Sequence, residues 1–197
     1  EKHMKKKGIT LIELIIVLAL NTIVLATIYN ISLVGNKVML KTEMQSELQS
    51  IAEEMQSELI YYLEAASEIL MINNIVAEEI YYKDLIDYNS EKLNKISVNS
   101  LEIKYSDESI IRLNLMDKEL SYMILGENKN IIQPKKTIAR YVEDFSIVPS
   151  DIRQIKDIED HNLKFSQGIK IDILLKKSKG YVNMEYPINT IITFKNK

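Results

Sequence analysis

The sequence predicts an α+β protein in which a long amino-terminal helix, membrane-spanning in its first half, packs on an antiparallel β-sheet head. Three observations predict this fold class. Residues 9–34 are almost entirely apolar and directly follow a basic segment. Apolar residues then recur at spacings of three and four as far as Ile69, which is the period of an α-helix. From residue 97 onward, segments rich in Ile, Val and Tyr follow one another without the alternating strand–helix order of a parallel sheet.

The apolar run at residues 9–34 predicts a membrane anchor. It follows Met-Lys-Lys-Lys-Gly at residues 4–8 and contains one charged residue, Glu13. As a helix it is long enough to cross a hydrocarbon core of about 30 Å. The lysines predict that the leader stays in the cytoplasm and the remainder lies outside. A secretory signal peptide is the alternative, but it needs a shorter apolar stretch and a small-residue cleavage site at its end. A retained anchor is therefore favoured.

Glu13 is the informative residue of this segment. A carboxylate within an apolar span is energetically costly, and such residues usually face a partner or a functional path. Alternatively, Glu13 reaches the lipid headgroups, because it lies only one turn from the start of the span. The residue alone leaves both interpretations open.

Residues 7–14, Lys-Gly-Ile-Thr-Leu-Ile-Glu-Leu, resemble the class III leader junction of type IV prepilins and type II secretion pseudopilins. The resemblance implies that a prepilin peptidase cuts after Gly8 and methylates the new amino terminus at Ile9. Glu13 then becomes the fifth residue of the mature chain and neutralises the amine of a neighbouring subunit during assembly. Phe or Met is commoner than Ile after the cut. Asn30 stands where many major pilins carry a helix-breaking proline, which counts against a role as the shaft subunit.

Beyond the membrane, an apolar stripe predicts that the helix continues from Ile9 to about Ile72. A stripe with this spacing is more often part of a core than a promiscuous binding surface. Asn73-Asn74 is the predicted end of the helix, and Gly35 is a point of weakness where it leaves the membrane. The stripe comprises Leu40, Met44, Leu48, Ile51, Met55, Leu59, Tyr62, Ala66 and Ile69.

The remainder of the chain is predicted to form strands, the first three of them an antiparallel meander. Pro187 interrupts the last strand or marks it as an edge strand. Tight turns are expected at 106–109, 116–119 and 177–180, and an irregular surface loop at 150–168. The predicted strands are Ser97–Tyr105, Ile110–Leu115, Leu120–Leu125, Ala139–Val148, Ile169–Leu175 and Val182–Phe194.

The carboxy-terminal half also resembles the PilW-type minor pilins and the J-type minor pseudopilins. The resemblance is carried by the hairpin at 101–115, by Tyr-Val-Glu-Asp-Phe at 141–145, by the strand at 169–175 and by the closing segment 188–196. It implies a low-abundance subunit near the filament tip that helps to initiate or cap a type IV pilus. Its implied partners are the prepilin peptidase, other major and minor pilins and the inner-membrane assembly platform.

The predicted organisation is a cleaved cytoplasmic leader (1–8), a transmembrane helix (9–34), an extracytoplasmic amphipathic helix (35–73) and a β-rich globular head (74–197). This describes a single-pass protein of the cytoplasmic membrane that later enters a surface filament or its tip. Three alternatives to a minor pilin remain open. They are a minor pseudopilin of a type II secretion or competence (DNA uptake) system, a tip adhesin and a membrane-anchored enzyme.

The charge balance counts against nucleic acid as a partner. Residues 1–8 hold four of the 25 basic and one of the 28 acidic residues, so the formal charge of −3 becomes −6 after removal of the leader. An acidic protein lacks the basic surface that binds phosphates. The lysines at 176, 177 and 179 are interpreted as a solvated turn rather than a DNA contact.

The sequence offers little material for catalysis. It has no cysteine and only five glycines, and no nucleophile-elbow, phosphate-loop or zinc-protease motif. We therefore expect neither an enzyme nor a cofactor. The acidic segment with Asp157, Glu159 and Asp160, next to His161, is a weak candidate for calcium. It lacks the spacing and central glycine of an EF-hand, so a solvated loop is the favoured interpretation.

Overall fold

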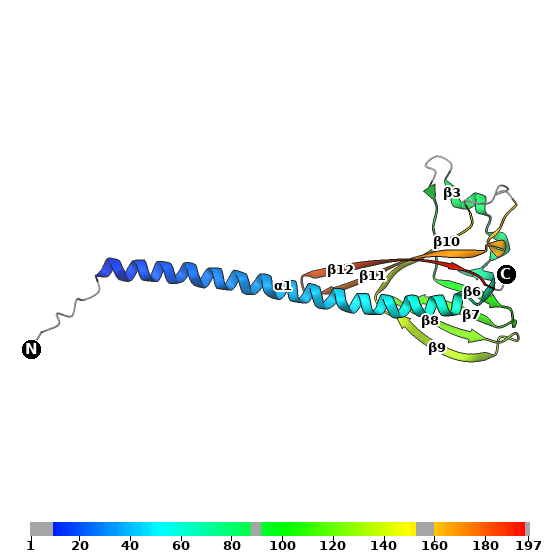
Figure 1. The fold of residues 1–197 in the computed structure, drawn as a ribbon, viewed down its shortest axis with the longest axis horizontal. Helices are drawn as coiled ribbons and strands as arrows, with labels where there is room; N and C mark the ends of the chain where they lie inside the picture. Colours follow the sequence, from blue (N-terminus) through cyan, green and yellow to red (C-terminus); the bar gives the residue numbers. More distant parts are fainter. Residues whose placement is uncertain (1–9, 88–91, 153–159, 196–197) are drawn as a thin grey trace, which may run out of the picture. The chain divides into compact units, whose positions relative to one another are not determined.

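The computed structural model describes residues 10–87, 92–152 and 160–195. The chain divides into two compact units, residues 1–43 and residues 44–197, called here the amino-terminal and carboxy-terminal units. One α-helix, α1, extends over Leu11–Leu63 and so runs through the boundary between them. All the strands lie in the carboxy-terminal unit and pair antiparallel. The α+β class predicted from the sequence is confirmed (Figure 1).

The second half of α1 provides one side of the core. Its buried residues are separated by three or four positions, so they form one face of the helix. Ile51 and Tyr62 are half-buried and pack at the margin of the same core. The buried residues are Met44, Leu48, Ala52, Met55, Leu59 and Leu63. The apolar stripe predicted from the sequence is thus the core face of the helix as far as Leu63.

The helix ends at Leu63, about two and a half turns before the predicted position. Residues 66–72, predicted to be helical, form strand β1 (Ala66–Ile72). Its pairing with β6 (Ser100–Tyr105) shifts register between Ala66 and Glu68, and again between Ile69 and Met71. Each β-bulge adds one residue to one strand, so the inward-facing positions become Ala66, Ile69 and Ile72. The bulges thereby give a strand the three-residue spacing that resembled a helix.

Asn73 and Asn74 form a hairpin turn instead of a helix end. They connect β1 to β2 (Ile75–Val76), and their φ angles are 51° and 68°. Two consecutive positive φ values are the hallmark of a type I′ turn, for which Asn is one of the few suitable residues. The Asn73 carboxamide also bonds the backbone of Ser97, Asn99 and Ser100.

A six-stranded sheet has the order β2-β1-β6-β7-β8-β9. Its central strands confirm the predicted meander, with β7 at Ile110–Met116 and β8 at Glu119–Leu125. Edge strand β9 (Ile131–Ala139) was not predicted. Most of its side chains are exposed, and Pro134 interrupts the alternation of apolar and polar residues by which strands are recognised.

A four-stranded sheet has the order β12-β11-β10-β5. It consists of β5 (Ile96–Ser97), β10 (Val142–Pro149), β11 (Gly168–Lys179) and β12 (Val182–Thr193). Pro187 lies within β12, which is an edge strand as predicted. The turn expected at 177–180 lies slightly later, because β11 continues to Lys179 and Gly180 adopts a φ of +61°.

Short elements complete the carboxy-terminal unit. They are β3 (Ile86–Asp87), β4 (Lys92–Leu93) and the 3-10 helices at Ala77–Glu79, Tyr82–Leu85 and Leu163–Phe165. The described parts of segment 150–168, predicted to be a surface loop, are partly internal. Asp151, Ile152, Leu163 and Ser166 are all buried.

Candidate functional site

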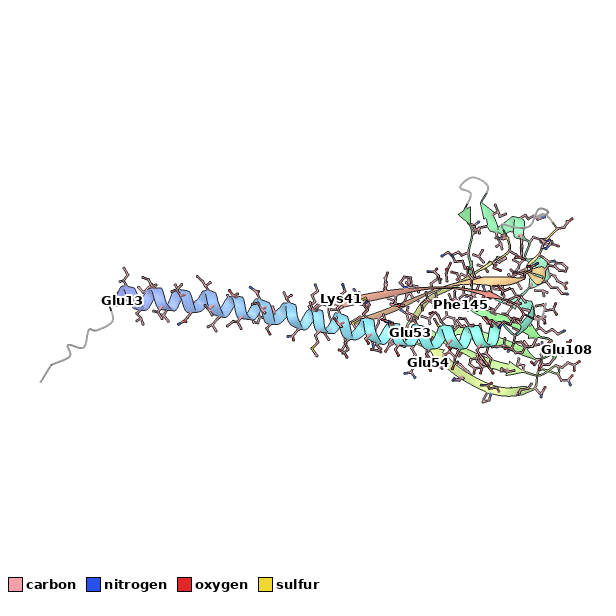
Figure 2. The ribbon with its side chains drawn as sticks, in the orientation of Figure 1. Glu13, Lys41, Glu53, Glu54, Glu108 and Phe145 are labelled. Carbon is pink, nitrogen blue, oxygen red and sulfur yellow. The ribbon has the colours of Figure 1, made fainter. Side chains whose placement is uncertain are left out.

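Glu13 lies in the first turn of α1 (Figure 2), where it forms hydrogen bonds with Thr10. The backbone N–H and the hydroxyl of Thr10 both donate to Glu13 Oε2, at 2.8 and 2.9 Å. In return, the Glu13 N–H donates to Thr10 Oγ1 at 3.4 Å. This reciprocal pattern is a capping box, which satisfies backbone donors that have no partner within the helix. The local sequence signal of this capping box is Thr-x-x-Glu at residues 10–13.

The capping box leaves part of the carboxylate available. Both hydrogen bonds from Thr10 use Oε2, and Glu13 is exposed. Within the described residues, no hydrogen bond or ion pair is found at Oε1. Glu13 can therefore keep its local contacts while it accepts a cation from another molecule. Gly8 and Ile9, the predicted cleavage junction, lie outside the described residues.

Between Leu11 and Met39 the large apolar side chains of α1 are exposed on every side of the helix (Figure 2). The segment is long and apolar enough to cross a membrane. Its threonines add little polarity, because Thr22 and Thr27 donate their hydroxyls to the carbonyls of Leu18 and Ile23 one turn earlier. Hydroxyls satisfied within the helix are compatible with lipid. This surface requires lipid or other apolar helices around it.

In the carboxy-terminal unit, side chains on both sides of the buried face of α1 form ion pairs and hydrogen bonds with the two sheets. Toward the six-stranded sheet, Glu58 pairs with Lys136, and the Tyr122 hydroxyl donates to the Tyr62 hydroxyl at 2.7 Å. Toward the four-stranded sheet, Gln56 Nε2 donates to Thr190 Oγ1 at 2.9 Å. Glu47 and Glu64 pair with Lys177 and Lys195. The helix is thus held along both sides of its buried face.

The lysines interpreted as a solvated turn belong to strand β11 and form specific contacts. Lys177 is largely buried between the Glu47 carboxylate and the Tyr141 ring, whose centroid lies 4.5 Å from Nζ. Lys176 pairs with Glu185 at 2.9 Å, and this hydrogen bond raises the pKa of Lys176. These lysines are therefore part of a strand and not of a solvated turn.

The weak calcium candidate cannot be assembled from the described residues. Asp157 and Glu159 lie outside them, whereas Asp160 is exposed. The His161 ring packs near Tyr82 and Phe165, with centroid distances of 5.6 and 5.9 Å. Over the ranges that the structure describes, no group of three or more potential metal-binding side chains occurs. Calcium binding at 157–160 stays a prediction, which calorimetry with added calcium can test.

A buried polar network around Asp151 was not predicted. Asp151 is 6% exposed and accepts hydrogen bonds from the Tyr82 hydroxyl at 2.9 Å, the Ser166 hydroxyl at 3.3 Å and the Gln167 N–H at 3.1 Å. Burial raises the pKa of Tyr82, so its hydroxyl remains a proton donor. The network connects three segments that are distant in sequence. Nothing in the local sequence distinguishes Asp151 from a solvated loop carboxylate.

The comparison with protein families agrees with the amino-terminal geometry. Residues 3–29 match the prokaryotic N-terminal methylation motif, a range that includes Gly8, Ile9 and Glu13. The chain thus carries the amino-terminal motif of type IV prepilins and pseudopilins. The motif implies processing by prepilin peptidase and assembly with other pilins, and together with the long apolar helix it indicates a membrane-anchored protein. No curated protein and no solved structure matches the chain.

Proposed function

We propose that this prepilin is a minor pilin that helps to initiate or cap the assembly of a type IV pilus. The observation that carries the proposal is an exposed apolar helix with a single carboxylate in its first turn. Cleavage after Gly8 creates a positively charged, methylated amine at Ile9. That amine needs an anion within the membrane, and Glu13 of a neighbouring subunit supplies it.

The pairing determines how subunits align. An isolated charge in lipid costs at least about 2.5 kcal/mol, whereas an ion pair removes most of that cost only when the two charges meet. Because Glu13 is the single charged residue of the span, the pairing favours one axial register between neighbouring helices. The capping box supports this role because it fixes the carboxylate beside the start of the helix.

Two features favour a minor subunit over the shaft subunit. Helix α1 continues unbroken through Asn30, where many major pilins have a proline. The carboxy-terminal half resembles PilW-type and J-type minor subunits in its hairpin at 101–115 and in its later strands. A position near the filament tip follows from that resemblance.

The proposed organisation follows the charge of the leader. Residues 1–8 form the cytoplasmic leader, the apolar helix from residue 9 to residue 34 spans the membrane, and the β-rich unit lies outside the cytoplasm. Residues 35–63 continue as helix beyond the span. After processing, the subunit moves from the membrane into the filament.

Deletion of the gene in the native host tests the proposal. Surface pili are counted by electron microscopy in the wild type, in the deletion strain and in a strain complemented with the intact gene. We expect pili to be lost in the deletion strain and restored by complementation. Normal pili in the deletion strain would contradict an initiating role and would favour a secretion or competence pseudopilin.

A further inference from the structure

A tyrosine-rich pocket lies where the end of α1 meets the six-stranded sheet. It has a volume of about 390 Å³, within the about 300–1,000 Å³ of typical small-molecule sites. Helix α1, strands β6, β8 and β9 and the turn after β6 all contribute to its lining. The residues that line this tyrosine pocket are Tyr61, Tyr62, Ala65, Tyr105, Asp107, Ser109, Ile124 and Ile132.

Aromatic rings dominate the pocket. Tyr61 and Tyr62 meet edge to face, with centroids 5.0 Å apart and an interplanar angle of 83°. Tyr62 in turn packs against Tyr122, with a centroid distance of 4.6 Å, and their hydroxyls are hydrogen-bonded. Tyr61 is 74% exposed although it is a large aromatic residue in the carboxy-terminal unit. A ligand in the pocket would find one accessible ring and a second ring held rigidly beside it.

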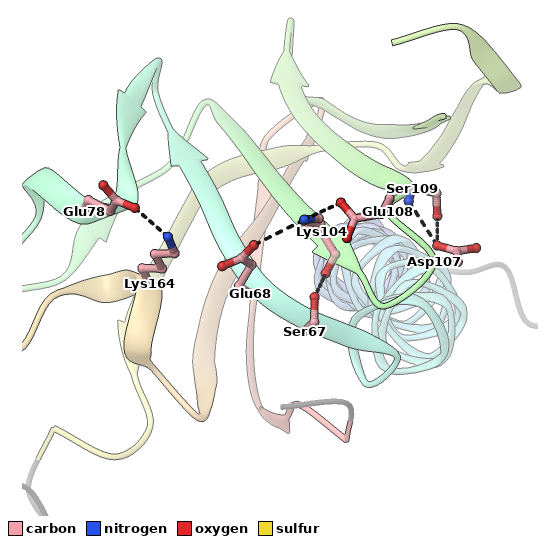
Figure 3. A network of polar contacts seen from close by, with 8 residues as sticks. All are labelled: Ser67, Glu68, Glu78, Lys104, Asp107, Glu108, Ser109 and Lys164. Atoms are coloured by element: carbon pink, nitrogen blue, oxygen red, sulfur yellow. Dashed lines mark hydrogen bonds and ion pairs between the residues drawn. The ribbon is translucent and has the colours of Figure 1, made fainter. Parts of the chain in front are cut away.

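Asp107 is the only ionised side chain among the lining residues. Its Oδ1 accepts both the hydroxyl and the backbone N–H of Ser109, at 2.5 and 3.0 Å (Figure 3). These hydrogen bonds lower the pKa of Asp107, so the carboxylate is anionic at neutral pH. The charges near the pocket have partners of opposite sign, because Glu108 pairs with Lys104 and Glu58 pairs with Lys136. The pocket therefore carries a local negative charge beside aromatic rings.

The Tyr105 hydroxyl is a second unusual feature. Its oxygen is buried, and within the described residues it has no hydrogen-bond partner. A buried polar group without a partner is uncommon in native proteins. This hydroxyl can turn its oxygen toward a cation, because no acceptor within the described residues holds its proton.

We propose that the tyrosine pocket binds a quaternary ammonium group of the choline type. Such a cation is attracted to the faces of aromatic rings and is the usual ligand of aromatic cages. It donates no hydrogen bonds and so needs no acceptor in the pocket. A primary ammonium would lose the water bound to its three N–H donors when it enters the pocket. The Asp107 carboxylate supplies the complementary charge. This role is independent of the assembly function proposed above.

The test uses the full-length protein in maltoside micelles, which contain no ammonium headgroup. Choline and tetramethylammonium are titrated and detected by saturation-transfer NMR of their N-methyl protons. The matched control ligand is 3,3-dimethylbutan-1-ol, which has the shape of choline without its charge. Tyrosine fluorescence gives a second readout, since the chain has 11 tyrosines and no tryptophan. We expect saturable binding of both cations and at least tenfold weaker binding of the neutral alcohol.

Paired variants localise the binding. Tyr61→Leu and Asp107→Asn should each weaken choline binding at least fivefold. Tyr181→Leu, at an exposed tyrosine in the β11–β12 turn, and Asp117→Asn, at an exposed carboxylate in the β7–β8 turn, should leave it unchanged. Circular dichroism confirms that all four variants are folded. Absence of saturable choline binding, equal binding of the neutral alcohol, or equal effects of the control variants would each overturn the proposal.

Discussion

At the scale of single residues, Glu13 combines a local contact with the proposed contact between subunits. Its carboxylate accepts two hydrogen bonds from Thr10 in the same chain, which stabilises the start of the helix. The same carboxylate is the anion proposed to meet the amine of a neighbouring subunit. A substitution at Glu13 removes both contacts, so a test must separate them.

Glu13→Leu should leave membrane insertion intact and strongly reduce recovery of the subunit in sheared filaments. Thr10→Ala provides the separation, because it removes the capping hydroxyl at a cost of about 1 kcal/mol and keeps the carboxylate. We expect Thr10→Ala to assemble at near wild-type levels. Both variants are measured by immunoblotting of membrane and filament fractions. Normal recovery of Glu13→Leu in filaments would refute the pairing.

Asp151→Ala should destabilise the carboxy-terminal unit. The substitution leaves the buried Tyr82 hydroxyl and the Gln167 N–H without the acceptor that Asp151 provides, whereas the Ser166 hydroxyl also donates to the Gly168 carbonyl. Each unsatisfied buried group costs about 1–3 kcal/mol, so we expect a loss of at least about 2 kcal/mol in the free energy of unfolding. Urea denaturation followed by circular dichroism measures it. Asp160→Ala, at an exposed carboxylate, is the control and should change little; similar losses in both variants would contradict the network.

Ser109→Ala should raise the pKa of Asp107 toward the ordinary value of 3.8, because the hydroxyl of Ser109 is the main cause of its depression. The backbone N–H bond remains, so the pKa should stay below that value. NMR titration of the carboxyl carbon measures it. Because the pKa of Asp107 is lower in the folded state than in the unfolded state, its ionised carboxylate stabilises the protein at pH values above the unfolded-state pKa. This stabilisation is lost as the pH falls through the folded-state pKa. An unchanged pKa in Ser109→Ala would show that the hydroxyl is not the cause.

At the scale of elements, the buried face of α1 is the central packing surface. Met55 is 0% exposed and lies midway along this face. Met55→Ala should lower the free energy of unfolding by about 2–5 kcal/mol, as expected for a large-to-small change in a core. Met116→Ala, at the last residue of β7, which is 65% exposed, is the matched control and should be nearly neutral. Urea denaturation distinguishes them; equal stabilities would mean that this helix face is not part of the core.

The two long edge strands share a protective feature. Pro134 lies in β9 and Pro187 in β12, and both prolines are exposed at the outer edge of their sheets. Proline lacks the N–H that another strand would use for pairing. Lys135 and Glu185 add charge to the same edges. The sheets are therefore protected from edge-to-edge association while the exposed apolar helix remains available for assembly.

At the scale of the whole molecule, the core is contained within residues 44–197. Every residue of the main apolar cluster lies between Leu48 and Phe194. A fragment that starts at Lys41 should therefore fold without the membrane span and remain soluble. A fragment that starts at Ala66 lacks the buried face of α1 and should fail to fold. Circular dichroism and thermal melting of the two fragments check this; cooperative melting of the shorter one would show that α1 is dispensable to the core.

Much of the fold followed from local patterns. The apolar span was recognised by its length and composition, and the helical stripe from Met44 to Leu59 and the meander from 100 to 125 were recognised by their periods. Local patterns failed at β1, where bulges in the pairing with β6 change the spacing of inward-facing residues from two to three. Bulges arise from contacts between strands, so residues 66–72 carried no local sign of them. Similarly, β9 is mostly exposed and leaves no alternating pattern.

The sequence alone determined the membrane anchor, the processing motif and the single carboxylate at Glu13, because each depends on residues that are close together along the chain. The tertiary structure decided which helix face is buried, where α1 ends and which distant residues meet. The Asp151 network and the tyrosine pocket both join segments far apart in sequence. Burial and partnership are properties of the folded chain, and a residue's neighbours in sequence do not specify them.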